Sequence, residues 1–174
     1  MAESDVSRLV AALADIERHV STLGWDQPAR LFALVETSTL LKLEPQLRGR
    51  VTETVADALT AVEQEDFHLG PDIAARLAQL TWPETVVGCA LAMERAFLPP
   101  ECEDQVPADP DAAAAFVSSH PQRTDVRVVV GALRDGSRHG LARMLSAPDD
   151  LLGAEDLVPG LADALLATLK EEPV

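Results

Sequence analysis

Arginines are concentrated in one part of the chain, between residues 123 and 143. Only two acids, Asp125 and Asp135, lie among them, although the formal net charge of the whole chain is −15. A guanidinium can hold a carboxylate or a phosphate through two parallel hydrogen bonds, which suits it to binding an anion or an acidic partner. Arginines in an acidic protein can equally pair with neighbouring acids. Both interpretations apply to Arg123, Arg127, Arg134, Arg138 and Arg143.

The dipeptide Asp135-Gly136 predicts how these arginines are presented. Asp-Gly between two strand-like runs indicates a hairpin with a two-residue turn, because the type I′ turn needs positive φ at both positions. In that register Arg138 lies opposite Leu133, and Val130 lies opposite Leu141. The candidate partner- or anion-binding residues on and beside this hairpin are Arg127, Arg134, Arg138, His139 and Arg143.

The two cysteines do not form a catalytic or metal-binding pattern. Cys89 lies in an apolar run, where a thiol is buried and stays neutral. Cys102 lies in an acidic, proline-rich loop, where the neighbouring carboxylates disfavour a thiolate. Their positions favour neither a disulfide nor a C-x-x-C motif, so we expect a reducing compartment.

One segment, residues 63–68, has the composition of a metal site. Glu63 and Glu65 would share a strand face, and His68 lies just beyond them. A metal site would need further ligands, and the sequence has neither an H-E-x-x-H motif nor a calcium loop. We interpret the segment as a solvated strand edge protected by acids. Phosphate-binding glycine loops and a nucleophile elbow are also missing from the sequence, so it predicts no catalytic residues, no metal and no cofactor.

The composition restricts the class of protein further. The chain has 174 residues, of which 47% are hydrophobic and 25% charged, as expected for one globular domain spanning residues 1–174. A pI of about 4.5 argues against binding to nucleic acid or anionic lipid, because phosphate would be repelled. The N-terminal residues MAESDVSR are acidic where a signal peptide would be basic, and no apolar run reaches the ~18–20 residues of a membrane helix. We therefore expect a cytoplasmic protein.

The first half of the chain predicts a helix followed by two strands. Apolar residues at helical spacing between Val6 and Leu23 indicate the helix, with Ser4 as its cap and Gly24 at its end. In residues 30–36, both sets of alternate residues are apolar, so both faces of the strand would be buried, which is typical of a central strand. The remaining predictions for this half are a short helix within 37–47 capped by Ser38 and a charged edge strand at 59–65.

The second half predicts further helices and strands. The strand at 85–98 has bulky residues on one side, facing the main core, and small residues on the other, where a helix or a second subunit can approach. On the hairpin, one face would hold Val126, Val128 and Val130 with Leu141 and Leu145. The other predicted elements are a helix opening at Gly70-Pro71-Asp72, a helix capped by Asp109, and a C-terminal helix at 156–170. This order indicates an α+β fold with about five strands in a mostly antiparallel or mixed sheet, packed by the N- and C-terminal helices.

Several segments resemble a family of small, uncharacterised actinobacterial proteins. The resemblance rests on GWDQPARLFALVET (24–37), WPETVVGCALAMERAFLPPE (82–101), DVRVVVGALRDGSRHGLARML (125–145) and DLVPGLADALLATL (156–169). It implies a bacterial, cytoplasmic protein, and it brings no assigned activity. The element order is also loosely similar to the type III secretion chaperone-like fold, whose members are small, acidic, usually dimeric and bind other polypeptides. The helices predicted near 38–47 and 110–120 depart from that plan.

These observations favour a non-catalytic, acidic domain that binds another protein, as a chaperone or adaptor does, or that pairs with a second copy of itself as a homodimer. The alternative is a small enzyme or ligand-binding protein that recognises an anionic metabolite through the arginine-rich hairpin 123–143. Contact with nucleic acid through that hairpin is disfavoured by the net charge of −15.

Overall fold

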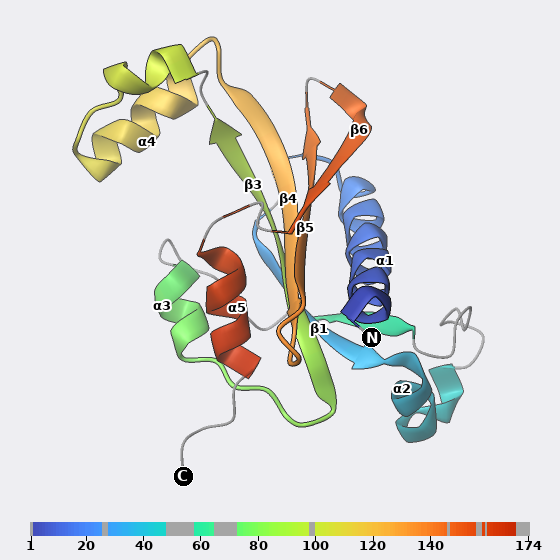
Figure 1. Ribbon diagram of the computed structural model, residues 1–174. Coiled ribbons are helices and arrows are strands. Elements are labelled where there is room, and N and C mark those ends of the chain that lie inside the picture. Colours follow the sequence, from blue (N-terminus) through green and yellow to red (C-terminus); the bar gives the residue numbers. More distant parts are fainter. Residues whose placement is uncertain are drawn as a thin grey trace.

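A six-stranded antiparallel sheet forms the centre of the protein (Figure 1). The computed structural model describes residues 2–25, 28–47, 58–64, 73–97, 100–145, 147–155, 158 and 160–169. Within these ranges the strands lie in the order β2-β1-β3-β4-β5-β6, and each neighbouring pair is antiparallel. The predicted α+β class is confirmed, with one strand more than expected. The strands are β1 (Arg30–Glu36), β2 (Leu59–Glu63), β3 (Val86–Phe97), β4 (Thr124–Leu133), β5 (Arg138–Met144) and β6 (Ala147–Ala154).

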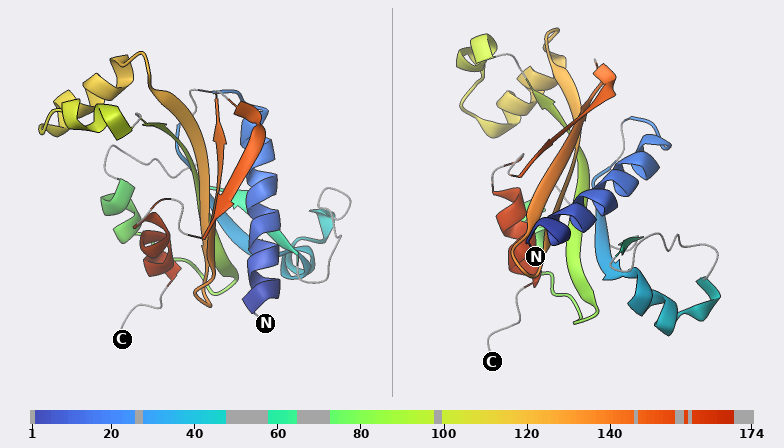
Figure 2. Two further views of the ribbon diagram at one scale, coloured as in Figure 1. Left: turned by 45° about the horizontal axis from the view of Figure 1, so that its top comes forward. Right: turned by 45° about the vertical axis from the view of Figure 1, so that its right-hand side comes forward.

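Helices cover both faces of the sheet. The first helix, α1, lies on one face, and α3 and α5 lie on the other, while α4 stands away from the sheet beyond one end of β3 and β4 (Figures 1 and 2). Within the described ranges, no helix is both long and apolar enough to cross a membrane. The helices are α1 (Ala2–Ser21), α2 (Thr37–Leu43), α3 (Ile73–Ala78), α4 (Pro110–Ser119) and α5 (Leu161–Leu169), with 3-10 turns at Pro45–Leu47 and Pro100–Gln105.

The α1 face has a core of its own. The predicted stripe of α1 is buried against the small-residue side of β3, where Ala90 and Ala92 lie. Gly131 on β4 lets the helix approach, because a Cβ atom there would come within 2.7 Å of Leu13 Cδ2 and 3.1 Å of Leu9 Cδ1. Of the two neighbours predicted for the small side of β3, the structure therefore shows a helix of the same chain.

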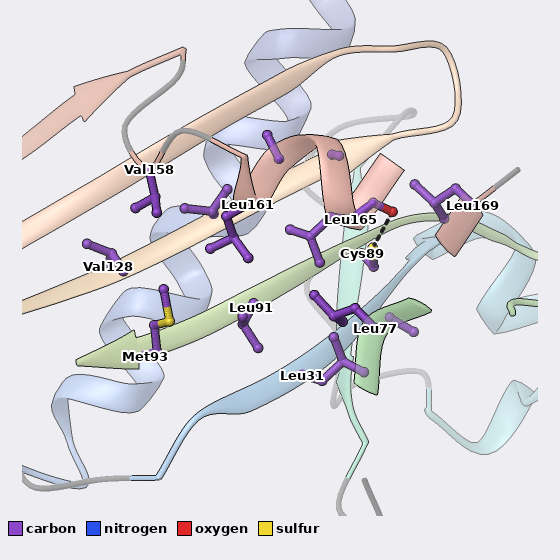
Figure 3. Close-up of a cluster of buried hydrophobic side chains, with 14 of the residues drawn as sticks. Leu31, Leu77, Cys89, Leu91, Met93, Val128, Val158, Leu161, Leu165 and Leu169 are labelled. Atoms are coloured by element: carbon purple, nitrogen blue, oxygen red, sulfur yellow. Dashed lines mark hydrogen bonds between the residues drawn. The ribbon is translucent and has the colours of Figure 1, made fainter. Parts of the chain in front are cut away.

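The opposite face holds the larger core (Figure 3). The bulky side of β3, with Cys89, Leu91 and Met93, packs there against α5 and α3, as predicted. Leu165 of α5 and Leu77 of α3 are almost fully buried in this layer. Because both faces of β3 and β4 are covered, these central strands have few polar residues.

The predicted hairpin register between β4 and β5 is wrong by one residue. Val130 lies opposite Gly140 and Ala132 lies opposite Arg138. The loop has three residues rather than two: the Gly136 N–H donates to the Leu133 carbonyl at 3.0 Å, and the Leu133 N–H donates to the Ser137 carbonyl at 2.9 Å. Gly136 has φ +98°, as the left-handed residue that follows the tight turn in such loops does.

This single-residue shift exchanges the two faces of β5. Leu141 was predicted to share a face with Val128 and Val130, but it packs in the α1-face core with Val129. Ala142 takes its place opposite Val128 and joins the α5-face core.

Some predicted element boundaries also need correction. Helix α5 begins at Leu161, after Gly160 with φ +85°, and the preceding segment contains the unpredicted strand β6. The sequence did not predict that strand because it contains Pro148 and two adjacent aspartates, and proline and aspartate are rare in strands. Ser4 and Ser38 lie inside α1 and α2 rather than at their caps. The predicted edge strand and the Asp109 cap are confirmed, the latter accepting from Ala112 N at 3.0 Å, whereas Gly70-Pro71-Asp72 lies outside the described residues.

Candidate functional site

The structure divides the five candidate residues between the two faces of the sheet. On the α1 side, Arg127 of β4 lies directly opposite Arg143 of β5, and His139 lies opposite Gly131. Arg138, one position from His139, is on the α5 side, and Arg134 in the hairpin loop also reaches α5. A single pocket lined by Arg127, Arg138, His139 and Arg143 is therefore not formed in this structure.

Arg134 ties the hairpin loop to the C-terminal end of α5. Its Nε donates to the Val86 carbonyl at 2.7 Å, one terminal nitrogen donates to the Pro83 carbonyl at 3.0 Å, and the other donates to the Leu169 carbonyl. The last carbonyls of a helix have no partner within the helix and carry partial negative charge, so a guanidinium stabilises them. These contacts give Arg134 a structural role.

Arg138 forms an ion pair with Asp163 of α5 at 2.8 Å. The Asp163 side chain is largely exposed, and an ion pair of this kind contributes little to stability. Arg134 and Asp163 line an open recess of about 480 Å³ with the apolar side chains of Leu166 and Leu169. The guanidinium of Arg134 is already directed at carbonyls, so the recess does not present an unpaired cation to an anion.

On the α1 side, four residues form a buried polar cluster, the Glu17 cluster: Glu17, Ser21, Arg127 and Arg143. Glu17 and Arg127 are both 2% exposed. The Ser21 hydroxyl lies 2.9 and 3.0 Å from the two Glu17 carboxylate oxygens and accepts from Arg127 at 2.9 Å. Arg143 forms an ion pair with the same carboxylate. The cluster links the C-terminal end of α1 to β4 and to the C-terminal end of β5.

The same cluster fixes the chain that follows α1. Arg127 donates to the Gly24 carbonyl at 2.7 Å, and its guanidinium lies 4.5 Å from the centre of the Trp25 ring. Sequence reasoning singled out the two arginines and missed Glu17. The helical spacing could have identified it, because Glu17 lies four residues after Leu13 and three before Val20, on the buried face of α1.

Cys89 is a core thiol. Burial raises the pKa of Cys89 to about 11, although hydrogen bonds from Thr168 and Trp82 and the charge of Arg134 act in the opposite direction. Its Sγ lies 3.6 Å from the Leu165 carbonyl (Figure 3). The same Sγ lies 3.5 Å from Thr168 Oγ1. The predicted neutral, structural thiol is confirmed, and Cys89 is not an activated nucleophile.

The other chemical candidates have ordinary packing contacts. Cys102 is buried in the 3-10 turn Pro100–Gln105 and donates to Gln122 at 3.2 Å, so it is packed rather than free in a loop. Glu63 pairs with Arg30 at 2.7 Å, and residues 65–68 lie outside the described part of the chain. Within the described part, no three histidine, cysteine or acidic side chains converge as metal ligands would.

One surface stands out by its exposed apolar side chains, at the turn between β5 and β6 and on β6 itself. Three of the six large hydrophobic residues that are exposed in the described ranges lie here: Leu145 (46%), Leu151 (40%) and Leu152 (49%). Two exposed acids, Asp149 and Asp150, lie between them in the chain. We call these five residues the β5–β6 corner. Sequence reasoning missed it, because the segment did not predict a strand.

The two leucines of β6 point to opposite faces of the sheet. Leu151 lies opposite Arg143, on the α1 side, and Leu152 lies opposite Ala142, on the α5 side. Figure 1 shows β6 at an outer edge of the sheet. The strand order places β2 at the opposite edge. The main contacts of α1 are with β2, β3, β4 and β5, and those of α5 are with β3, β4 and α3, so neither helix shields these leucines.

Comparison with known proteins gives a family and no activity. A family model described as PPA1309-like protein matches residues 9–170, which is most of the chain. No curated protein and no solved structure matches the chain. The chain therefore belongs to the PPA1309-like protein family.

Proposed function

We propose that this member of the PPA1309-like family is a non-catalytic domain that binds another protein through the β5–β6 corner. The observation that carries the proposal is the exposure of three leucines at the β5–β6 corner, along one edge of the sheet, in a chain with a formal net charge of −15. Exposed apolar groups rimmed by polar residues are typical of protein contact sites. Here the rim is supplied by Asp149 and Asp150.

The negative charge of the protein indicates the charge of the partner's contact surface. A formal net charge of −15, together with two exposed aspartates at the corner, favours a partner whose contact surface is basic and apolar. Fully burying a leucine side chain is worth about 1.5–3 kcal/mol, so covering two half-exposed leucines supplies about 2 kcal/mol. Each 1.4 kcal/mol is a tenfold change in Kd, so loss of both leucines weakens binding by about 30-fold.

The test compares two double variants of similar exposure. Leu151→Ser/Leu152→Ser removes the apolar groups of the corner, and Leu43→Ser/Val62→Ser removes two exposed apolar groups on α2 and β2, toward the other edge of the sheet. A partner captured from lysate of the host is purified, and its Kd for each variant is measured by calorimetry. We expect at least tenfold weaker binding for the corner variant alone. Equal affinities for the two variants would overturn the proposal.

The same preparation also tests the ligand-binding alternative. Thermal unfolding is followed with inorganic phosphate and with succinate, and a specific ligand at 100 times its Kd adds about 2.7 kcal/mol of stability. Stabilisation of that size, lost in Arg143→Gln, would favour an anion site over a protein contact.

The cellular setting is part of the proposal. Both cysteines are free, which supports a reducing compartment and hence the cytoplasm. The resemblance to actinobacterial proteins supports a bacterial host. We treat self-association as a competing outcome, because a second copy would bring the same acids to the contact.

A further inference from the structure

We propose that the partner contributes a short extended segment, basic at both ends, which adds to the sheet as a further strand along Leu151–Ala154 of β6. This inference rests on the proposed function, because it specifies what occupies the β5–β6 corner.

The outer edge of β6 is open for such pairing. It is the last strand of the sheet and pairs with β5 alone. In the described part of the chain, no hydrogen bond joins the outer edge of β6 to another element. Alternate residues of an edge strand direct their N–H and C=O groups outward, where an added strand can pair with them.

Only part of β6 is regular enough for this role. Leu151 to Ala154 pair residue for residue with β5, from Arg143 to Gly140. The register then jumps, so that Ala147 lies opposite Met144 and the residues in between, Pro148 to Asp150, do not pair. The partner segment can therefore pair only with the short stretch Leu151–Ala154. Its side chains contact Leu151 on one face of the sheet and Leu152 on the other.

Charge disfavours a second copy of this chain as the occupant. A symmetric antiparallel pair centred on Leu151–Ala154 would place Asp150 of one copy opposite Glu155 of the other, and both residues are exposed. Moving the centre toward residue 150 would instead bring the aspartates of the two copies together. Like charges directly opposite each other on neighbouring strands are destabilising, and each copy also carries a net charge of −15.

The same acids define the segment that fits. Asp150 and Glu155 flank the four regular residues of the edge. An antiparallel strand with a Lys or Arg opposite each acid and four residues between them, two of them apolar, would pair with both acids and contact both leucines. Proline and acids at an edge protect it against unspecific pairing, and they leave a basic strand as the favoured occupant.

The probe is the eight-residue peptide Gly-Lys-Thr-Thr-Val-Val-Lys-Gly, whose two adjacent valines lie opposite Leu152 and Leu151 when its lysines lie opposite Glu155 and Asp150; it is blocked at both ends and labelled for fluorescence anisotropy. Two analogues serve as controls. One has glutamate in place of both lysines. The other carries N-methyl groups on alternate backbone amides, which blocks pairing with a strand edge and keeps the side chains. We expect both analogues to bind at least tenfold more weakly, and we expect slower hydrogen exchange at β6 amides with the unmodified peptide.

Protein variants complete the test. The double variant Asp150→Lys/Glu155→Lys is expected to reverse the preference, so that the glutamate peptide binds more tightly than the lysine peptide. Equal affinity for the N-methylated and unmodified peptides would overturn strand addition and leave the corner as a side-chain contact. Strand addition would also be overturned if no peptide binds while binding of a purified partner still depends on Leu151 and Leu152. A dimer in sedimentation equilibrium that is lost in Leu151→Ser/Leu152→Ser would overturn the proposal in favour of a second copy.

Discussion

Replacement of Glu17 by glutamine tests whether the buried polar cluster beneath α1 holds this helix on the sheet. The carboxylate of Glu17 is 2% exposed, accepts from Ser21 and pairs with Arg143. Glutamine keeps the shape of the side chain and removes its charge. Two guanidiniums, of Arg127 and Arg143, then lie directly opposite each other on neighbouring strands without the Glu17 carboxylate beside them.

The magnitude follows from burial. Breaking a fully buried ion pair by removing one partner costs about 3–5 kcal/mol. The Arg143 side chain is 24% exposed, so water compensates part of this cost, and we expect a loss of about 2–4 kcal/mol. For a protein of this size, each kcal/mol lowers Tm by about 2–4 °C, which gives a decrease of about 4–16 °C.

The assay is equilibrium urea unfolding of Glu17→Gln, Arg143→Met and the double variant. If the charges interact, the double variant is less destabilised than the sum of the two single variants, because methionine removes the guanidinium that has lost the Glu17 carboxylate. A loss below about 1 kcal/mol for Glu17→Gln, or strict additivity in this cycle, would refute the reasoning. Two-state unfolding is checked by the coincidence of fluorescence and circular dichroism transitions.

Three further results are expected. Arg134→Gln loses hydrogen bonds to several carbonyls and should lower the free energy of unfolding in urea by about 2–3 kcal/mol. Arg138→Gln removes only an exposed ion pair and should lower it by less than about 1 kcal/mol. Equal losses for the two variants would contradict the structural role of Arg134. Burial raises the pKa of Cys89 to about 11, so the folded state favours the neutral thiol. In urea unfolding, the stability of the natural protein relative to Cys89→Ala should therefore fall by about 2 kcal/mol as the pH rises from 8 to 11. A stability difference that does not change with pH would count against a buried thiol. Gly88→Ala places a Cβ atom 2.6 Å from the Ala132 carbonyl oxygen and should cost about 1–3 kcal/mol of unfolding free energy, and an unchanged Tm would show that β4 can shift.

The fold class and most elements could be predicted from periodicity. The stripe of α1, the two-sided burial of β1 and the long strand β3 follow from hydrophobic spacing, which depends only on the geometry of helix and strand. The unequal sides of β3 even predicted two different neighbours. The cap at Asp109 was equally local, since one side chain and the three residues after it determine that bond.

The register of the hairpin could not be predicted in this way. Asp135-Gly136 fits both a two-residue and a three-residue loop, and the two differ by one position. Packing decides between them, because Leu141 fits the α1-face core and Ala142 fits beneath the α5 layer. The predicted partner- or anion-binding surface depended on that register, and the structure divides its arginines between the two faces.

The sequence by itself determined the acidic character, the apolar stripes and the absence of familiar catalytic motifs, since these depend on residue types and local spacing. The tertiary structure alone decided that Glu17 lies beside Arg143 and that 147–154 is an edge strand. Residues 17 and 143 are far apart in the chain, and their contact exists only because α1 crosses β5. The exposure of Leu151 and Leu152 is likewise set by where the helix layers end, which no local pattern encodes.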